Sequence, residues 1–389
     1  MFTLWKVREW AQFLLVGGVL FFLSNCDQKN KRANQGSLPY LNFQDSTTIY
    51  FPLDSETSSI NNYYRIVELD GIPFFCFFNE LNFRFYYYNL TNKHEFFGTA
   101  PLVQSGPNGV GKTIFAFVPK PDSTIILHSY YQKSLITVNW EGEVLQRRKL
   151  KTAGFPISSS TAPFAAIDRS FFIYSNLSPA PNRDVNTMPL LFEWQSNEDS
   201  LKDWGIRMPE FYQQKGDFHY HSRLSKVTLG YNLVDQRILL GLPLQDSIWV
   251  VDREKETIDQ KYFGHPDFEL NPQTDWRQVE MSSVAEMKVW LGSDRYSTLM
   301  YDAMHKLYFR RFYWRIPEAL LERDQLKSKS VLLVADSTFN LLGQLPYNFS
   351  EKQVIYQGKI YQFQLRLDQE DSLMVNVYTL MNMNKSIKN

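Results

Sequence analysis

The sequence predicts an all-β fold, a β-propeller of six blades, with seven blades as the alternative count. Aromatic residues make up 16% of the 389 residues and include 30 Phe and 22 Tyr, a composition that favours strands over helices. Turn-and-strand units also recur along the chain. They fall within larger units of roughly 40 to 65 residues, a spacing typical of four-stranded blades. A jelly roll or a two-domain β-sandwich is the structural alternative.

Three segments show the recurring unit most clearly: "PDSTIILHS" from Pro121, "QDSIWVVD" from Gln245 and "EDSLMVNVY" from Glu370. In each, an Asp-Ser turn precedes alternating apolar and β-branched residues, which is the pattern of a strand. Six candidate blades lie near residues 60–100, 110–154, 163–212, 224–264, 294–346 and 353–380. We expect the strand in "STTIYFP" near Thr48 to complete the last blade and close the ring.

Loop and short helical inserts are expected between the blades. The Pro-rich segment from Asn176 predicts a loop, and the segment from His265 predicts a loop followed by a short helix. The segment "IPEALLERDQLKSKS", from Ile316, has Pro near its start and good helix formers, which predicts a surface helix. Inserts of this kind are expected on one face of a propeller.

The N-terminus predicts export and a lipid anchor. Residues 1–25 have a charged start, an apolar run from Ala11 to Leu23 that is too short to span a bilayer, and a cleavage region. This pattern resembles a bacterial lipoprotein signal, in which the thiol of Cys26 is lipidated. The polar residues 26–39 then form a flexible tether, and residues 40–389 form the single propeller domain.

One position departs from the lipoprotein pattern, because Asn25 is bulkier than the small residue that usually precedes the lipidated cysteine. An uncleaved anchor and an ordinary secretory peptide therefore stay as alternatives. We expect the protein in the cell envelope, lipid-anchored in the outer membrane and facing the periplasm or the surface. Cys76 is the second of two cysteines, and its apolar neighbours "PFFCFF" predict a buried, inert thiol.

The stretch "GPNGVGKT", from Gly106, matches the nucleotide-binding P-loop pattern, but its context does not. A P-loop needs a buried strand before it and a helix beginning at its Lys. Here residues 114–118 are strand formers, and Pro119 and Pro121 would break a helix. We therefore predict no nucleotide binding, and a turn that leads into a strand.

The turn prediction has a specific form. At least one of Gly106, Gly109 and Gly111 is expected to have positive φ, a region that a Cβ disfavours. In the strand that follows, Phe115 and Phe117 are expected on one face, and Ile114, Ala116 and Val118 on the other.

Two groups of residues are candidate binding sites. Asp217, His219 and His221 share one face of a predicted strand and could supply metal ligands. A solvated strand face is the alternative explanation. The run "KLYFRRFYWR" places Tyr308, Arg310, Arg311 and Arg315 together, which suggests an anionic or sugar ligand. A half-exposed strand whose arginines cover aromatic edges explains this run equally well.

No residue is predicted to be catalytic, and no cofactor is predicted. The chain has no G-x-S-x-G elbow and no evident pair of glycosidase carboxylates. Its 41 basic and 41 acidic residues give zero net charge, so bulk charge would not recruit nucleic acid.

Several features together resemble one known family. The lipoprotein start, "GPNGVG" before a strand, "YDAMHKLYFRRFYW" and the Asp-Ser turns are similar to the six-bladed propeller lipoproteins of Bacteroidota, in the group called domain of unknown function 4221. The resemblance covers nearly the whole mature chain. It implies fold and location but no activity, since the family has no assigned chemistry.

The function expected from the sequence is therefore binding. A lipid-anchored propeller would hold a peptide, a glycan or a partner protein of the envelope, without catalysis. The alternative is an envelope hydrolase or lyase that uses polar residues at the central channel. A cluster of His, Asp and Arg at one mouth of the channel would favour the enzyme, and an aromatic or uncharged mouth would favour binding.

Overall fold

The computed structural model describes 37–57, 63–91, 96–120, 122–129, 132–150, 155–157, 165–167, 170–176, 189–195, 200–210, 212, 226–270, 283–317, 320, 328–346, 352–364 and 371–380. The chain divides into two units, Met1–Pro39 and Tyr40–Asn389, and nearly all of the described residues belong to the second. None of the described helices is long and apolar enough to cross a membrane.

The described strands form six antiparallel sheets. The first holds β2 (Tyr64–Leu69), β3 (Ile72–Asn79), β4 (Arg84–Asn89) and β5 (Phe96–Pro101). The second holds β6 (Ile114–Pro119), β7 (Thr124–Ser129), β8 (Ser134–Asn139) and β9 (Val144–Lys149). The third holds β10 (Phe155–Ile157), β11 (Ala165–Ile167), β12 (Ser170–Asn176), β13 (Leu191–Gln195) and β14 (Ser200–Asp203).

The remaining three sheets complete the ring. The fourth holds β15 (Thr228–Asn232), β16 (Arg237–Gly241), β17 (Ser247–Asp252) and β18 (Thr257–Tyr262). The fifth holds β19 (Arg295–Asp302), β20 (Leu307–Tyr313), β21 (Ser330–Ala335) and β22 (Leu341–Pro346). The last holds β23 (Gln353–Tyr356), β24 (Lys359–Phe363), β25 (Ser372–Leu380) and β1 (Phe43–Pro52).

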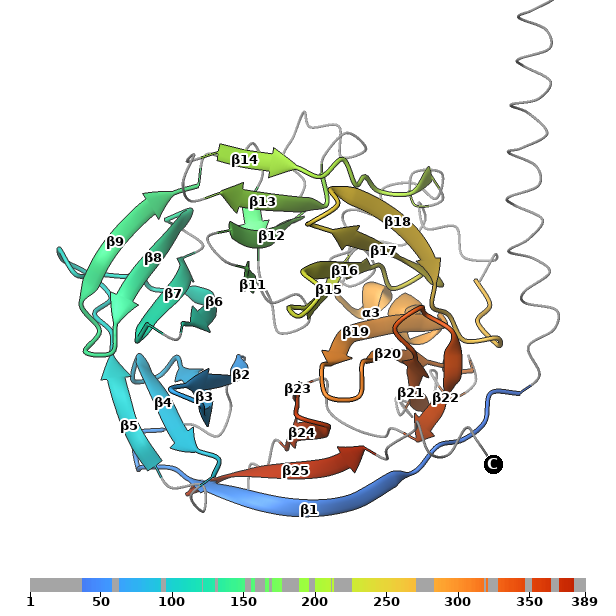
Figure 1. Cartoon of the computed structure of the whole chain (residues 1–389), viewed down its shortest axis with the longest axis horizontal. Coiled ribbons are helices and arrows are strands. Elements are labelled where there is room, and N and C mark those ends of the chain that lie inside the picture. Colours follow the sequence, from blue (N-terminus) through green and yellow to red (C-terminus); the bar gives the residue numbers. More distant parts are fainter. Residues whose placement is uncertain are drawn as a thin grey trace, which may run out of the picture. The chain divides into compact units, whose positions relative to one another are not determined.

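The sheets are arranged around a central axis. In the five four-stranded sheets, the first strand lies nearest the axis and the last strand on the rim (Figure 1). The all-β propeller fold is thereby confirmed. Each predicted blade segment overlaps one sheet, but β10 of the third sheet lies outside the predicted residues 163–212. Five sheets have the regular four-stranded form. The third is irregular, because the two short strands β10 and β11 both pair with β12.

The two ends of the domain close the ring within the last sheet. Strand β1 pairs antiparallel with β25, with Ile49 opposite Val375. The predicted closing strand near Thr48 is therefore confirmed, and it lies at the rim. Because β1 and β25 are far apart in the sequence, their pairing ties the beginning and the end of the domain together.

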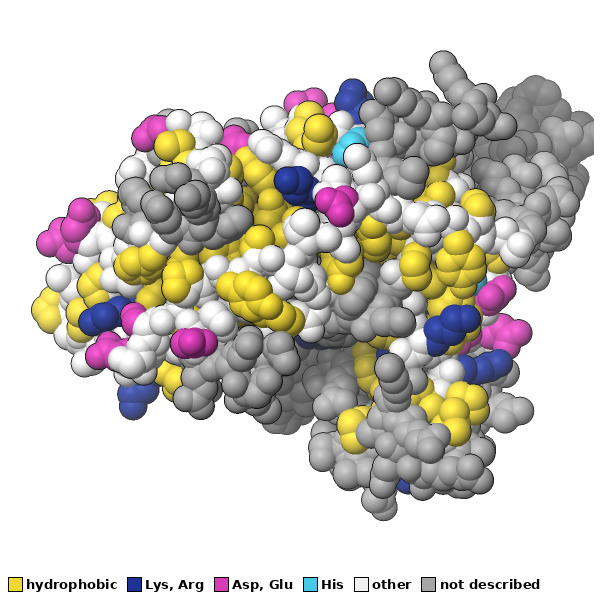
Figure 2. Space-filling model, turned by 90° about the horizontal axis from the view of Figure 1, so that it is seen from below, with side chains coloured by type: hydrophobic (Ala, Val, Ile, Leu, Met, Phe, Trp, Pro, Cys, Tyr) yellow, Lys and Arg dark blue, Asp and Glu magenta, His cyan; other side chains and the backbone are white. Residues whose placement is uncertain are grey.

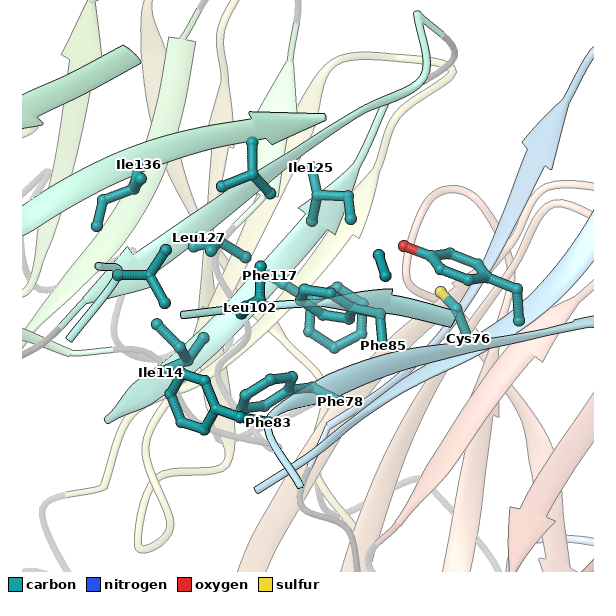
Figure 3. Packing of buried hydrophobic residues seen from close by; sticks show 14 of the residues in the cluster. Cys76, Phe78, Phe83, Phe85, Leu102, Ile114, Phe117, Ile125, Leu127 and Ile136 are labelled. Carbon is teal, nitrogen blue, oxygen red and sulfur yellow. The ribbon is translucent and has the colours of Figure 1, made fainter. Parts of the chain in front are cut away.

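The core lies between neighbouring sheets. Between the first and second sheets, buried apolar side chains from both form one cluster, which includes Cys76, Phe85 and Phe117 (Figure 3). The rings of Phe85 and Phe117 lie 4.7 Å apart, edge to face. Each fully buried Phe contributes about 1.5–3 kcal/mol through burial. Burial also raises the pKa of the Cys76 thiol, as expected for an inert cysteine.

The segment "GPNGVGKT" is a turn that leads into β6, as predicted. Gly106 and Gly111 have positive φ, 88° and 90°. The amide of Val110 donates to the carbonyl of Val103 (2.7 Å), and that of Gly111 donates to Gln104 (3.1 Å). These amides are therefore used within the loop, and residues 114–119 form a strand where a P-loop would have a helix.

The predicted faces of β6 are wrong at Ile114. A β-bulge shifts the pairing of β6 with β7 between Ile114 and Ala116. The extra residue turns Ile114 to the face of Phe117, and both pack against the first sheet. Ala116 packs on the other side, next to Val118. Alternation in the sequence cannot reveal an inserted residue, so the sequence did not show the bulge.

The predicted inserts lie partly within the described residues. The helix α3 (Ser283–Leu291) falls in the segment after His265, as expected. Most of the predicted helix after Ile316 lies outside the described residues. The Asp-Ser turns also differ in position, since Asp122 precedes the second strand of its sheet whereas Asp246 and Asp371 precede third strands.

Candidate functional site

Arg310, one of the predicted ligand residues, is completely buried within the fold. Its guanidinium donates to the carbonyl oxygens of Phe263 (2.8 Å), Gln245 (2.6 Å) and Leu242 (3.2 Å). All three carbonyls belong to the neighbouring fourth sheet or to the residues that follow its strands. Burial lowers the pKa of Arg310 to about 10. These hydrogen bonds join the fifth sheet to the fourth.

Arg311 and Tyr308 are also buried, on opposite faces of β20. Arg311 donates to the hydroxyl of Ser330 (3.2 Å) and lies over the ring of Tyr313. The hydroxyl of Tyr308 accepts a hydrogen bond from Asn232 (2.9 Å), and its ring stacks on Phe339. These contacts of Arg311 lie within the fifth sheet, whereas Tyr308 joins the fifth sheet to Asn232 of the fourth.

Arg315 is the one member of the predicted group whose side chain is exposed. It pairs with Glu269 at 2.7 Å, and its backbone amide donates to Asp294 (2.7 Å). A ligand role for the whole run would need Arg310 and Arg311 to leave their buried positions. The ligand role stays a prediction, and the geometry leaves only Arg315 available for it at the surface.

The other predicted sites lie outside the described residues. These are the lipidation site Cys26 and the metal candidates Asp217, His219 and His221. Within the described part of the chain, no three His, Cys, Asp or Glu side chains come together to hold a metal ion.

A different site becomes visible at one end of the ring. The turns that join the first and second strands of the fourth, fifth, last and first sheets share this end, where hydrogen bonds link each sheet to the next. We call it the inner-hairpin end. Two of its turns are alike: Asn232–Gln236 in the fourth sheet and Asp302–Lys306 in the fifth.

In both turns, the first side chain accepts a hydrogen bond from the amide three residues on. Asn232 accepts from Asp235 (3.0 Å), and Asp302 accepts from His305 (3.1 Å). The fifth residue has positive φ in each, at 49° and 57°. Hydrogen bonds to an Asn or Asp side chain stabilise this turn independently of its two central residues. The turn itself therefore does not determine which residues stand at its tip.

The tips of these two turns are apolar and exposed. Leu233 is 59% exposed, Val234 is 66% exposed and Met304 is 67% exposed. A turn of the same form in the fourth sheet, Asp252–Glu256, has the charged pair Arg253 and Glu254 at its tip. The turn form therefore does not require apolar tips.

Polar contacts link neighbouring sheets at the inner-hairpin end. The amide of Gly358, in the turn between β23 and β24, donates to the buried carboxylate of Asp302 (2.9 Å). The hydroxyl of Tyr356 donates to Glu68, which links the last sheet to the first. Together with the bond between Asn232 and Tyr308, these contacts connect four neighbouring sheets at this end.

His305 lies at the same end, held against Asp302 with 2.6 Å between Nδ1 and the carboxylate. The absence of a side chain at Gly358 makes this possible, since a Cβ there would lie 2.5 Å from Cε1 of His305. An imidazole that donates through Nδ1 to a buried carboxylate leaves Nε2 as a base. His305 and Asp302 thus form a His-Asp pair next to the apolar tips.

The inner strands carry aromatic side chains toward this end. Tyr231, Tyr301 and Tyr356, on β15, β19 and β23, are each half-buried. The phenol of Tyr231 also interacts with the Arg65 guanidinium of β2. Burial lowers the pKa of Arg65, and the phenol partly opposes that change. The mouth at this end therefore combines tyrosines with a few charged groups.

One face of the described surface is mixed in charge. On the face that Figure 2 shows, basic and acidic side chains are interspersed and neither sign forms a large patch. This distribution agrees with the zero net charge of the chain. It gives no basic track of the kind that would follow a nucleic acid backbone.

Sequence reasoning missed the inner-hairpin end, although a signal was present. Both turns begin with Asn or Asp and have a polar residue three positions later, which predicts a turn. An apolar pair between such residues is unusual for a turn tip.

Comparisons with known proteins agree with the fold. A family model described as "Domain of unknown function (DUF4221)" matches residues 40–344. No curated protein matches the chain. A DUF4221 member from Bacteroides vulgatus is 17% identical with a TM-score of 0.69, over 89% of this chain and 99% of its own. A putative exported protein from Bacteroides fragilis is 10% identical with a TM-score of 0.56, over 87% and 95%. At these identities, the likeness establishes the fold alone.

Proposed function

The chain belongs to the DUF4221 family, and on that premise we propose that it is a lipid-anchored cell-envelope propeller that binds a partner protein at its inner-hairpin end. The function of the family is unknown, so the proposal is argued from the residues at the inner-hairpin end. In this proposal the irregular third sheet counts as a blade, which makes the ring six-bladed, and the protein has no catalytic role.

The observation that supports binding is the pair of apolar turn tips. Leu233, Val234 and Met304 are each more than half exposed, on neighbouring sheets, where a turn normally has polar residues. Exposed aliphatic side chains lose unfavourable contact with water when a partner covers them. Leu, Val and Met suit an apolar protein surface better than a glycan, so a protein is the favoured ligand among the three expected.

The hydrogen bonds at this end support the same proposal. The tips stand on turns fixed by Asn232 and Asp302, and the turn of the fifth sheet is tied to Gly358. A surface that is already ordered loses little conformational entropy on binding. The half-buried tyrosines at the mouth would add contact area at low entropic cost.

The anchoring part of the proposal rests on the N-terminus. Residues 1–25 have the pattern of an export signal, and Cys26 follows at the lipidation position. One structural neighbour is itself named a putative exported protein. A lipid-anchored domain on a short tether would meet partners in the envelope, with the outer membrane as the proposed location.

Copurification tests the proposal. Tagged full-length protein is extracted from membranes as wild type, as Leu233→Ser/Val234→Ser and as Leu81→Ser. Leu81 is the matched control, because it is 76% exposed on a turn of the same kind at the opposite end of the ring. We expect a partner that copurifies with the wild type and with Leu81→Ser but not with the double variant. Equal recovery with all three would contradict the proposal.

A hydrolase or lyase is the second candidate, and one observation favours it. The His305 imidazole is oriented by the buried Asp302 carboxylate, an arrangement that suits a general base. His305→Gln would abolish such an activity while leaving partner binding intact. A panel of ester, lactone and glycoside substrates, tested with wild type and His305→Gln, separates the two functions. Turnover by both proteins at the same rate would rule out His305 as the base.

A further inference from the structure

A row of polar side chains crosses the last sheet from the axis to the rim. Gln353 of β23 lies opposite Gln362 of β24, which lies opposite Asn376 of β25, which lies opposite Thr48 of β1. The four side chains share one face, because directly opposed residues point to the same side of a sheet. At the rim, two members of the row bond to each other, since the hydroxyl of Thr48 donates a hydrogen bond to the side chain of Asn376 (2.9 Å).

This face is turned toward the fifth sheet. Ile355 and Ile360, each two residues from a glutamine of the row, pack against Met300 and Phe309 of the fifth sheet. Side chains two residues apart on a strand lie on the same side. The glutamine side chains therefore lie in the seam between the fifth and last sheets. They are two residues along their strands from this apolar contact. On the fifth sheet, Arg311 lies two residues beyond Phe309 and therefore on the same face of β20.

The inner half of the row is not satisfied. Gln362 is fully buried, and its Nε2 has no hydrogen-bond partner among the described residues, while its Oε1 accepts from Gln364 (3.3 Å). Gln353 is half-buried as a residue, but both polar atoms of its side-chain amide are buried. Neither atom has a hydrogen-bond partner in the described part of the chain. Each such group costs roughly 1–3 kcal/mol if it stays unpaired.

The missing partner has a defined hydrogen-bonding character. Gln353 leaves one amide donor group and one carbonyl acceptor, and Gln362 leaves a second donor group. Exchanging the oxygen and nitrogen of the Gln353 amide would not change this count. A hydroxyl has one donor and two acceptor lone pairs, which complement these three groups. A carboxylate or phosphate could not donate to the Gln353 carbonyl, and an ammonium could not accept from either amide.

We propose that the seam between the fifth and last sheets is a binding site for a hydroxyl group, held by the amides of Gln353 and Gln362. The hydroxyl belongs either to an ordered water molecule or to a small polyol or sugar. Buried water commonly satisfies such groups inside proteins, with about three hydrogen bonds each. The site is independent of the inner-hairpin end, because it lies near the start of β23, away from the turn that follows that strand.

A crystal structure at high resolution tests the site and separates the two sources of the hydroxyl. One set of crystals is grown and cooled without polyols, and a second set is soaked in glycerol. Density within hydrogen-bonding distance of both amides is expected in each set. Water in both sets identifies water as the guest, and glycerol in the second set shows that a polyol can replace it. A dry seam, with the two amides paired to other side chains, would overturn the proposal.

Stability in solution gives an independent test, because a bound hydroxyl and an empty seam predict opposite changes in the denaturant midpoint. Met resembles Gln in length and shape, so Gln353→Met keeps the packing while it removes the amide. If a hydroxyl is bound, this change removes two of its three hydrogen bonds, and Gln362 loses its partner if the guest leaves, so the denaturant midpoint falls. If nothing is bound, it removes two unsatisfied groups, and the midpoint rises or stays unchanged. Gln146→Met, on an exposed position of β9, is the control and should leave the midpoint within error.

Discussion

The guanidinium carbon of Arg310 lies 3.8 Å from the centre of the Tyr296 ring. The two residues belong to adjacent strands of the fifth sheet, β20 and β19, and both are buried. The stacked ring fixes the plane of the guanidinium, so that its N–H groups point at carbonyls of the fourth sheet. A charged side chain thus joins two blades of the ring without any contact with solvent.

Replacing Arg310 by Met is expected to lower the free energy of unfolding by about 2–4 kcal/mol, because the carbonyls of Phe263 and Gln245 lose buried donors. Urea unfolding measures the change. Arg315→Met is the control. Its pair with Glu269 is exposed, so the loss should stay below about 1 kcal/mol. Equal effects of the two substitutions would show that Arg310 does not join the sheets.

Replacing Gly111 by Val is expected to destabilise the domain by about 1–3 kcal/mol. Gly111 has φ of 90°, which a β-branched residue adopts only under strain, and a Cβ there would lie 2.8 Å from the hydroxyl of Ser129. Lys112→Ala, next to it on the surface, should change stability by less than about 0.5 kcal/mol. A Gly111→Val protein as stable as the wild type would show that this turn does not depend on the glycine.

The wild-type protein is expected to lose stability as the pH falls from about 6.5 to about 4. Burial holds the pKa of His128 at about 4 in the folded state, whereas an unfolded His has its ordinary value of about 6.5. Between these values the unfolded chain binds more protons, so acid favours unfolding, by about 3 kcal/mol over the whole range. Burial lowers the pKa of His265 as well, which acts in the same direction.

Unfolding free energies of wild type and His128→Leu, measured from pH 7.5 to pH 4.5, test this. The variant should have a clearly shallower slope across the range, and His265 acts in the same direction in both proteins. Hydrogen-bonded carboxylates such as Asp336, whose pKa is lowered, contribute mainly at lower pH. Parallel pH curves for the two proteins would contradict the assignment to His128.

Replacing Cys26 by Ser is expected to move the protein from the membrane fraction to the soluble fraction, because a single substitution removes the acyl chains. Immunoblots of the fractions after a high-salt wash measure the distribution. If the Cys26→Ser protein still pellets with the membranes, the N-terminus is an uncleaved anchor or the protein is held there by a partner. Repeating the fractionation with Leu233→Ser/Val234→Ser in the same background separates these two cases.

Much of the fold could be predicted because its signals are local. Alternating apolar residues and Asp-Ser turns identified the strand groups, and the positive-φ glycines before β6 followed from the turn itself. The bulge at Ile114 could not be predicted, because an inserted residue leaves the apolar pattern intact. The pairing of β10 and β11 with one strand depends on contacts between segments, which no local pattern records.

The candidate sites were harder to predict, because burial is decided by distant residues. Arg310 looked like an exposed ligand residue, but its carbonyl partners Phe263 and Leu242 lie 47 and 68 positions away in the sequence. The amides of Gln353 and Gln362 look like ordinary strand residues until the register places them opposite each other. The Asn232 and Asp302 turns could be predicted, but not that two apolar tips would share one end of the ring.

Site-specific crosslinking tests the proposed binding end most directly. A photo-reactive amino acid is placed at position 304 or, as the control, at position 81, in the full-length protein, and cells are irradiated before the membranes are isolated. The proposal predicts a discrete adduct with another envelope protein from position 304 and none from position 81, with loss of the adduct in the Leu233→Ser/Val234→Ser background. Adducts from position 81 alone, or the same adducts from both positions, would contradict binding at the inner-hairpin end.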